Sequence, residues 1–168
     1  VTAIEKIYAV YTTDPDIQQP GIPENNPRKL RGAVTFDHVN YYAHDDVILR
    51  DISFDVQPGQ TVGIIGATGS GKSTLINLIC RFYDVTGGRV LVDGVDVRKL
   101  DLQVLRANIG MAMQDVFLFS DTIEGNIAYG NPDCSFDDVV RAAKIATADE
   151  FIREMPEGYD TIVGERGV

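Results

Sequence analysis

One stretch of the sequence, GATGSGKST, combines the glycines and side chains that a polyphosphate site needs. It matches the pattern G-x-x-x-x-G-K-[ST] at every position. Its glycines allow backbone angles that a Cβ atom forbids, so successive N–H groups can turn towards one anion. The stretch therefore predicts a phosphate-binding loop made of Gly66, Ala67, Thr68, Gly69, Ser70, Gly71, Lys72, Ser73 and Thr74.

Two side chains of this loop are expected to carry most of the chemistry. Lys72 can reach the β- and γ-phosphates as a point charge, and Ser73 can place its hydroxyl on Mg²⁺. Thr74 can add a donor near the α-phosphate. A helix that begins near Lys72 would add unpaired N–H donors and the positive end of its dipole. The alternative is a Gly- and Ser-rich turn before an amphipathic helix, with no ligand.

The elements on either side fit the chemical interpretation. Residues 61–65, TVGII, are an apolar, partly β-branched run, which predicts a buried parallel strand. Apolar residues then recur at helical spacing over 75–79, which predicts a helix directly after the loop. Residues 109–113 form a second apolar run that ends at Gln114, and we expect a second core strand there.

Strands and helices are also predicted away from the loop. Residues 33–41 alternate with one slip near Asp37, so a strand with a bulge is expected, and residues 51–56 alternate cleanly. After the strand at 51–56, Pro58 and Gly59 stand between two glutamines, which predicts a type II turn over residues 57–60. A further strand is expected over 89–92, ending in a turn at Asp93-Gly94, and helices over 102–108, 122–129, 135–146 and 148–154.

The first 31 residues have a different character. Thr2 and Glu5 have the spacing of a capping box, and apolar residues follow at helical spacing, so residues 1–12 predict a short helix with one apolar face. Residues 13–31 contain prolines and polar residues, a composition typical of a linker. We therefore expect a loosely tethered helix ahead of a domain that occupies residues 32–168.

Charge and cysteine content exclude several kinds of site. The 168 residues carry a net charge of −10, so nucleic acid is not an expected partner. Cys80 and Cys134 are far apart and belong to no C-x-x-C pair, so neither zinc nor a disulfide framework is indicated.

Four segments of the sequence, in the order in which they occur, resemble the nucleotide-binding domain of ATP-binding cassette (ABC) transporters of the exporter type. The segments that carry the resemblance are GATGSGKSTL, VILRDISFDVQPGQTVGIIG, RFYDVTGGRVLVDGVDVRKL and IGMAMQDVFLFSDTIEGNI. The resemblance implies an α/β fold: a P-loop NTPase (RecA-like) core, an antiparallel β subdomain and the start of a helical subdomain. Residues 1–12 resemble the helix that follows the membrane domain, 13–31 the linker, and 32–168 the N-terminal part of the cassette.

The resemblance also implies a function. Such a cassette binds ATP with Mg²⁺, pairs with a second nucleotide-binding domain, and hydrolyses ATP to drive transport, at the cytoplasmic face of a membrane to which a transmembrane domain tethers it. In the family the signature motif, the Walker B aspartate, the catalytic glutamate and the switch histidine follow, and none is found up to Val168. A nucleotide-binding or interaction fragment without hydrolysis is therefore the alternative. A P-loop GTPase is disfavoured because the sequence has no N-K-x-D motif.

Other site residues are carried over from the family. Gln114 matches the Q-loop glutamine, which touches Mg²⁺ and the attacking water; a polar residue that ends a strand is the plainer interpretation. Gly164, Glu165 and Arg166 resemble the X-loop, which with Gln114 lies towards the transmembrane domain; a charged surface turn is the alternative. Ala43 stands where an aromatic residue normally stacks on adenine, so Tyr42 is the candidate for that role, or else a surface aromatic, with Val47 beneath the base.

Overall fold

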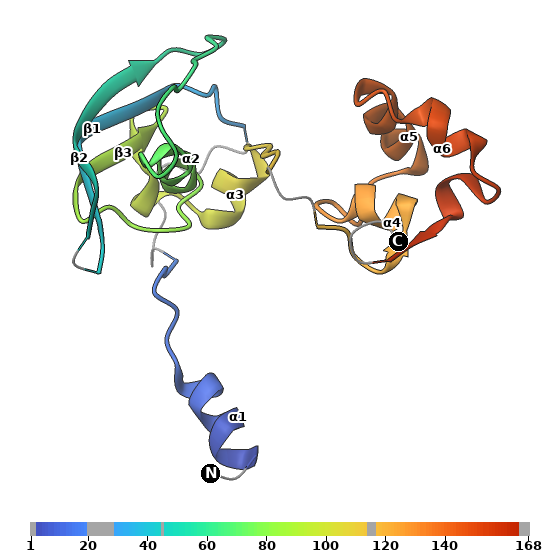
Figure 1. Cartoon of the computed structure of the whole chain (residues 1–168), viewed down its shortest axis with the longest axis horizontal. Coiled ribbons are helices and arrows are strands. Elements are labelled where there is room, and N and C mark those ends of the chain that lie inside the picture. Colours follow the sequence, from blue (N-terminus) through green and yellow to red (C-terminus); the bar gives the residue numbers. More distant parts are fainter. Residues whose placement is uncertain (1–2, 20–28, 45, 114–116, 165–168) are drawn as a thin grey trace. The chain divides into compact units, whose positions relative to one another are not determined.

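The structure is a computed structural model that describes residues 3–19, 29–44, 46–113 and 117–164. It divides into two compact units, Val1–Gly110 and Met111–Val168. Figure 1 shows the elements of both units. In the first unit these are α1 (Ala3–Thr12), β1 (Val34–Ala43), β2 (Asp46–Val56), α2 (Lys72–Ile79), β3 (Gly87–Val92), β4 (Val95–Asp96), a 3-10 turn (Val97–Lys99) and α3 (Leu102–Ala107).

A four-stranded antiparallel sheet is the frame of the first unit. Its strand order is β2-β1-β3-β4, with β1 paired to both β2 and β3. β2 begins earlier than expected from the sequence, at Asp46, because its first residues pair with the end of β1. The type II turn expected after β2 is confirmed: Gln60 N donates to Gln57 O, and Gly59 has a φ of 81°.

The bulge predicted near Asp37 is confirmed, and it shapes the core. The register of β1 against β2 shifts between Phe36 and Val39, and His38 between them has a φ of 49°. Three residues apart, Phe36 and Val39 would face opposite sides of a regular strand. The extra residue turns both side chains into the core, where both are buried.

The core of this unit lies between the sheet and helices α2 and α3. Leu78 of α2 and Leu105 of α3 are fully buried together with side chains from β1, β2 and β3. Phe36 and Phe54 stack across the strands with ring centroids 4.6 Å apart. The helix expected after the phosphate-binding loop is therefore confirmed, and its apolar side fastens it to the sheet.

Two expected strands do not form. Residues 61–65 and 109–113 have no strand structure, and neither run pairs with another strand among the described residues. Val62 is 51% exposed and Ile65 99% exposed. A parallel strand needs hydrogen-bonded neighbours and a cover on both faces, so an apolar run without them does not become a strand.

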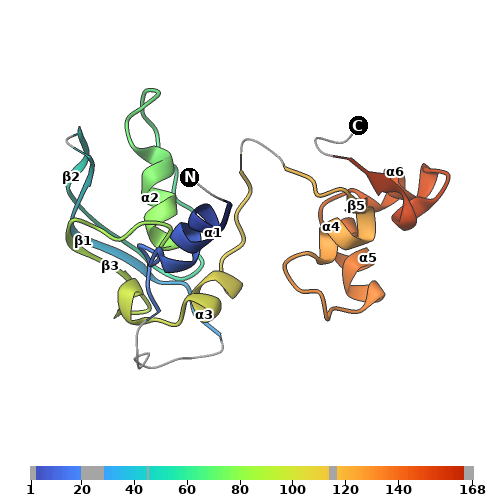
Figure 2. The same ribbon diagram turned by 90° about the horizontal axis from the view of Figure 1, so that it is seen from below.

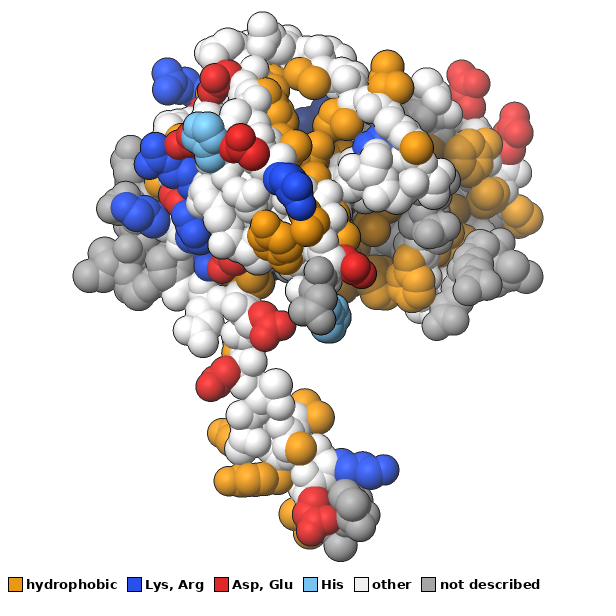
Figure 3. Space-filling view, turned by 60° about the vertical axis from the view of Figure 1, so that its left-hand side comes forward, with side chains coloured by type: hydrophobic (Ala, Val, Ile, Leu, Met, Phe, Trp, Pro, Cys, Tyr) orange, Lys and Arg blue, Asp and Glu red, His pale blue; other side chains and the backbone are white. Residues whose placement is uncertain are grey.

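The N-terminal helix is confirmed as α1, although Thr2 of its expected capping box lies outside the described residues. Five of its apolar side chains are exposed: Ile4, Ile7, Tyr8, Val10 and Tyr11. Figure 3 shows apolar side chains on the surface of this helix. In the described part of the chain, no helix combines the length and apolar character needed to cross a membrane.

The second unit is mostly helical and has its own core. It contains β5 (Asp121–Thr122), α4 (Ile123–Ala128), α5 (Phe136–Ile145), α6 (Asp149–Glu154), a 3-10 turn (Gly158–Asp160) and β6 (Ile162–Val163). Val139, Ala143, Ile152 and Tyr159 form its buried centre. Ser135 and Asp138 make the predicted capping box at the start of α5, because each side chain accepts from the other's backbone N–H. The three helices expected after residue 121 are thus confirmed.

Candidate functional site

The predicted phosphate-binding loop runs directly into the N-terminus of α2, whose first residue is Lys72 (Figure 2). Its N-cap, Gly71, is left-handed, with a φ of 84°, and no side chain caps the helix. By contrast, the Asp101 carboxylate caps α3 by accepting from two backbone N–H groups. The first N–H groups of α2 therefore meet no capping side chain, and with the helix dipole they favour an anion at this end.

The loop is folded around the ammonium group of Lys72. Its Nζ donates to the carbonyl oxygens of Gly66 at 2.9 Å and Ala67 at 2.7 Å. Ser70 N donates back to Ala67 O at 3.2 Å, which closes the turn. A Cβ added to Gly66 would lie 2.6 Å from Ser70 Oγ, so this position has room only for glycine unless Ser70 turns away. The cation is thus held at the centre of the loop, where a polyphosphate would need it.

The junction between the loop and α2 rests on β2. A Cβ added to Gly71 would lie 2.8 Å from Leu49 Cδ2 and 3.1 Å from the carbonyl oxygen of Ile48. Leu49 is buried in the core of the unit, so this contact surface is fixed. The phosphate-binding loop is therefore seated against the strand that carries Val47.

Tyr42 and Val47, the predicted adenine contacts, are brought together as cross-strand partners near the end of the β1–β2 hairpin. Both side chains are partly exposed, at 42% and 43%. Tyr41, which is half-buried, tilts against Tyr83 with centroids 5.6 Å apart. Burial, and after it the neighbouring Tyr83, raises the pKa of Tyr41, so this ring stays neutral and anchors the strand end. Tyr42 and Val47 therefore form an open apolar platform. Val47 directly precedes Ile48, one of the two residues against which Gly71 is seated.

Three of the other predicted site residues, Gln114, Glu165 and Arg166, lie outside the described residues. Gly164 is described and directly follows β6.

On the described residues, a magnesium ion would find only part of its ligand set. Within the described ranges, no group of three or more His, Cys, Asp or Glu side chains could hold a metal. Ser73 is exposed in the first turn of α2, next to Lys72. Mg²⁺ keeps several waters and takes oxygens from substrate phosphates, so one hydroxyl at this position fits such an ion.

The support beneath the loop is not predicted from the sequence. The strand expected over 51–56 excludes Ile48 and Leu49, although they belong to an apolar run that begins at Val47. That run could have indicated a strand start at this point. The contact with Gly71 could not have been found, because the two segments approach only after folding.

Comparison with known proteins identifies similar chains. The ABC transporter family profile matches residues 49–165. A multidrug export ATP-binding/permease protein of Bacillus subtilis is 51% identical over 83% of this chain and 24% of its own length. A fatty acid ABC transporter ATP-binding/permease protein of Mycobacterium bovis is 42% identical over 99% of this chain and 26% of its own length. This chain thus spans about a quarter of the length of these relatives.

One solved structure is similar over nearly the whole chain. It is that of a bacterial Atm1-family ABC exporter with ATP bound, which superimposes with a TM-score of 0.89. The two chains are 42% identical, and the match covers 98% of this chain and 29% of the other. These likenesses confirm the P-loop NTPase fold class expected from the sequence.

Proposed function

The chain belongs to the ABC transporter family, of the exporter type, and on this premise we propose that residues 66–74 bind the phosphates of MgATP. The observation that carries this proposal is the ammonium of Lys72 held inside the loop, 2.9 Å from Gly66 O, at a helix N-terminus that no side chain caps. The γ-phosphate would accept hydrogen bonds from the Lys72 ammonium, and the first turn of α2 would supply N–H donors to the other phosphates.

Mg²⁺ would be held by Ser73 together with phosphate oxygens and water, and it would neutralise part of the phosphate charge. Gln114 is proposed as the second residue near the metal and the attacking water. Adenine would lie on the platform of Tyr42 and Val47. Their position next to the seat of Gly71 supports this arrangement, because one nucleotide can reach both places.

For the longer protein to which such a cassette belongs, we propose ATP hydrolysis coupled to transport. Its relatives are named as ATP-binding/permease proteins, which fits a cassette joined to a transmembrane domain at the cytoplasmic face of a membrane. The second cassette of a pair would supply the rest of the site. For the 168 residues themselves, we propose nucleotide binding without hydrolysis, because the sequence contains no LSGGQ motif.

Docking to the transmembrane domain is proposed for the second unit, through Gln114 and the segment that begins at Gly164. A groove of about 350 Å³ in this unit supports the proposal. It is lined almost entirely by apolar side chains, including Ile123, Phe151 and Val163, and Val163 directly precedes Gly164. An apolar groove of this kind suits a helix end of a partner domain.

The test is a calorimetric titration of the chain with MgATP. Lys72→Ala should abolish measurable binding, because the charge that pairs with the β- and γ-phosphates is removed. Lys144→Ala, which removes an exposed lysine of α5 in the second unit, is the matched control and should bind as wild type. Equal affinity for wild type and Lys72→Ala would overturn the proposed site.

A further inference from the structure

The C-terminal end of α2, opposite the phosphate-binding loop, is capped by a side chain from α3. Arg106 Nε donates to Cys80 O at 3.2 Å, and Arg106 Nη2 donates to Arg81 O at 2.9 Å. Cys80 is the C-cap of α2, and Arg81 follows it, so these carbonyls lie where a helix leaves its last acceptors without partners. The charge of the guanidinium group is also favourable beside the negative end of the helix dipole.

The turn that ends α2 is strained, so it depends on contacts from outside the helix. Phe82 N donates to Asn77 O at 2.9 Å. Arg81 N donates to Leu78 O at 3.1 Å, and together the two bonds form a Schellman motif. Glycine usually occupies the left-handed position of this motif, but here Arg81 has a φ of 50°. Arg106 covers this turn, because its guanidinium carbon lies 5.1 Å from the centre of the Phe82 ring.

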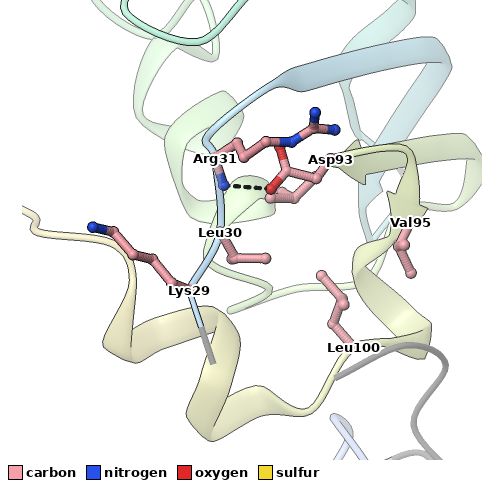
Figure 4. Close-up of a pocket in the computed structure, with 7 residues that line it drawn as sticks. Lys29, Leu30, Arg31, Asp93, Val95 and Leu100 are labelled. Carbon is pink, nitrogen blue, oxygen red and sulfur yellow. Dashed lines mark hydrogen bonds between the residues drawn. The ribbon is translucent and has the colours of Figure 1, made fainter. Parts of the chain in front are cut away.

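The helix that supplies Arg106 is itself fixed to the sheet. Leu105 is fully buried in the core that β1 and β3 share. Just after α3, Asn108 Oδ1 accepts from Leu30 N at 3.1 Å. Leu30 packs against the same core, and Figure 4 shows it in the pocket that Asp93 also lines, in the turn after β3. Arg106 therefore joins the end of α2 to a helix whose position the core determines.

We propose that Arg106 is a positioning residue for the nucleoside triphosphate, an inference that rests on the phosphate site proposed at the other end of α2. Helix α2 has eight residues, and a helix of this length is marginal without tertiary support. Loosening of its last turn therefore reaches its first turn, where the N–H groups must point towards the phosphates. Because Arg106 keeps the whole helix formed, a larger fraction of the chain is competent to bind, and the apparent affinity is higher in proportion.

Calorimetric titration of the full chain with MgATP, combined with urea unfolding, tests this role. Arg106→Ala removes both hydrogen bonds and should raise Kd by roughly threefold to thirtyfold. Arg106→Lys can keep one of the two bonds and should lie between Arg106→Ala and wild type; if Arg106→Ala does not fold, Arg106→Lys carries the comparison. Arg98→Ala is the matched control, because Arg98 bonds to Asp96 of β4 and to Gly88 O of β3 rather than to α2. It should lower the urea midpoint and leave Kd as in wild type.

Hydrogen exchange measured by mass spectrometry without nucleotide gives a second readout. Arg106→Ala should speed exchange along all of α2, including Leu75 N, which is bonded to Gly71 O at the start of the helix, whereas Arg98→Ala should not. The proposal is overturned if Arg106→Ala raises Kd no more than Arg98→Ala, or if exchange in the first turn of α2 is unchanged. Equal binding by wild type and Lys72→Ala is a different result: it would overturn the phosphate site itself, and the role of Arg106 in binding with it.

Discussion

Substituting alanine for Gly71 tests whether the phosphate-binding loop really depends on its seat on β2. Gly71 has a φ of 84°, where an alanine costs about 1–2 kcal/mol. Its new Cβ would also lie 2.8 Å from Leu49 Cδ2 and 3.1 Å from Ile48 O. The latter atom belongs to the backbone of a paired strand and cannot turn away, so overpacking adds roughly 1–3 kcal/mol. We expect a total loss of about 2–5 kcal/mol from a stability that is typically about 5–15 kcal/mol.

Gly69→Ala is the matched control for this change. Gly69 has nearly the same backbone angle, a φ of 81°, but a Cβ there would meet nothing within 4 Å. The two variants therefore share the backbone cost and the smaller entropy of the unfolded chain, and differ only in the contact.

Urea unfolding followed by far-UV circular dichroism measures the difference. With a typical m of about 1–3 kcal/mol/M, the midpoint for Gly71→Ala should lie about 1 M below that for Gly69→Ala. If both variants unfold at the same urea concentration, the contact with β2 contributes nothing and the seat is not a real constraint on the loop.

Three further outcomes are expected. Asp93→Asn should destabilise the chain by about 1.5–3 kcal/mol at neutral pH, since the carboxylate bonds to three backbone N–H groups. Burial raises the pKa of Asp93, but the hydrogen bonds from Ala33, Arg31 and Gly32 outweigh burial, so the pKa is lowered overall. The stability that Asp93 contributes should therefore be fully present above about pH 4 and be lost as the pH falls through the lowered pKa. The Asp93→Asn variant lacks this carboxylate, so its stability should fall less over the same pH range. Ser135→Ala removes the N-cap of α5 and should cost about 1 kcal/mol in urea unfolding, whereas Ser120→Ala, at an exposed serine outside the helices, should cost less than half of that. Because Val62, Ile64 and Ile65 are exposed, sedimentation velocity should show association that increases with concentration and is reduced by Ile65→Lys; a monodisperse monomer at all concentrations would contradict this.

Much of the candidate site could be predicted because its signals are local. The phosphate-binding loop is specified by neighbouring residues, from the glycines that allow left-handed angles to the lysine that follows them. The pairing of Tyr42 with Val47 is also short in range, since a hairpin joins them. Gln114 stays a prediction, because it lies outside the described residues.

The unpaired runs 61–65 and 109–113 show where local reasoning ends. Their composition is that of buried strands, and for this reason the sequence predicts a strand at each place. Whether such a run becomes a strand depends on another strand lying beside it, and no described segment does so. Strand propensity is a property of the residues themselves, whereas strand formation also requires a neighbouring strand with which they can form hydrogen bonds.

Features whose partners lie within a few residues follow from local sequence: the glycine loop and Lys72, the capping box of Ser135 and Asp138, and the turn at Gly59. Which distant groups meet depends on the folded arrangement. The bulge at His38 turns two core residues to one side, Gly71 comes to rest on β2, and Gln19 bonds to the start of α3. The reason is that a hydrogen bond between residues 82 positions apart leaves no periodic trace in composition, and it becomes favourable only after the fold has already brought both groups together.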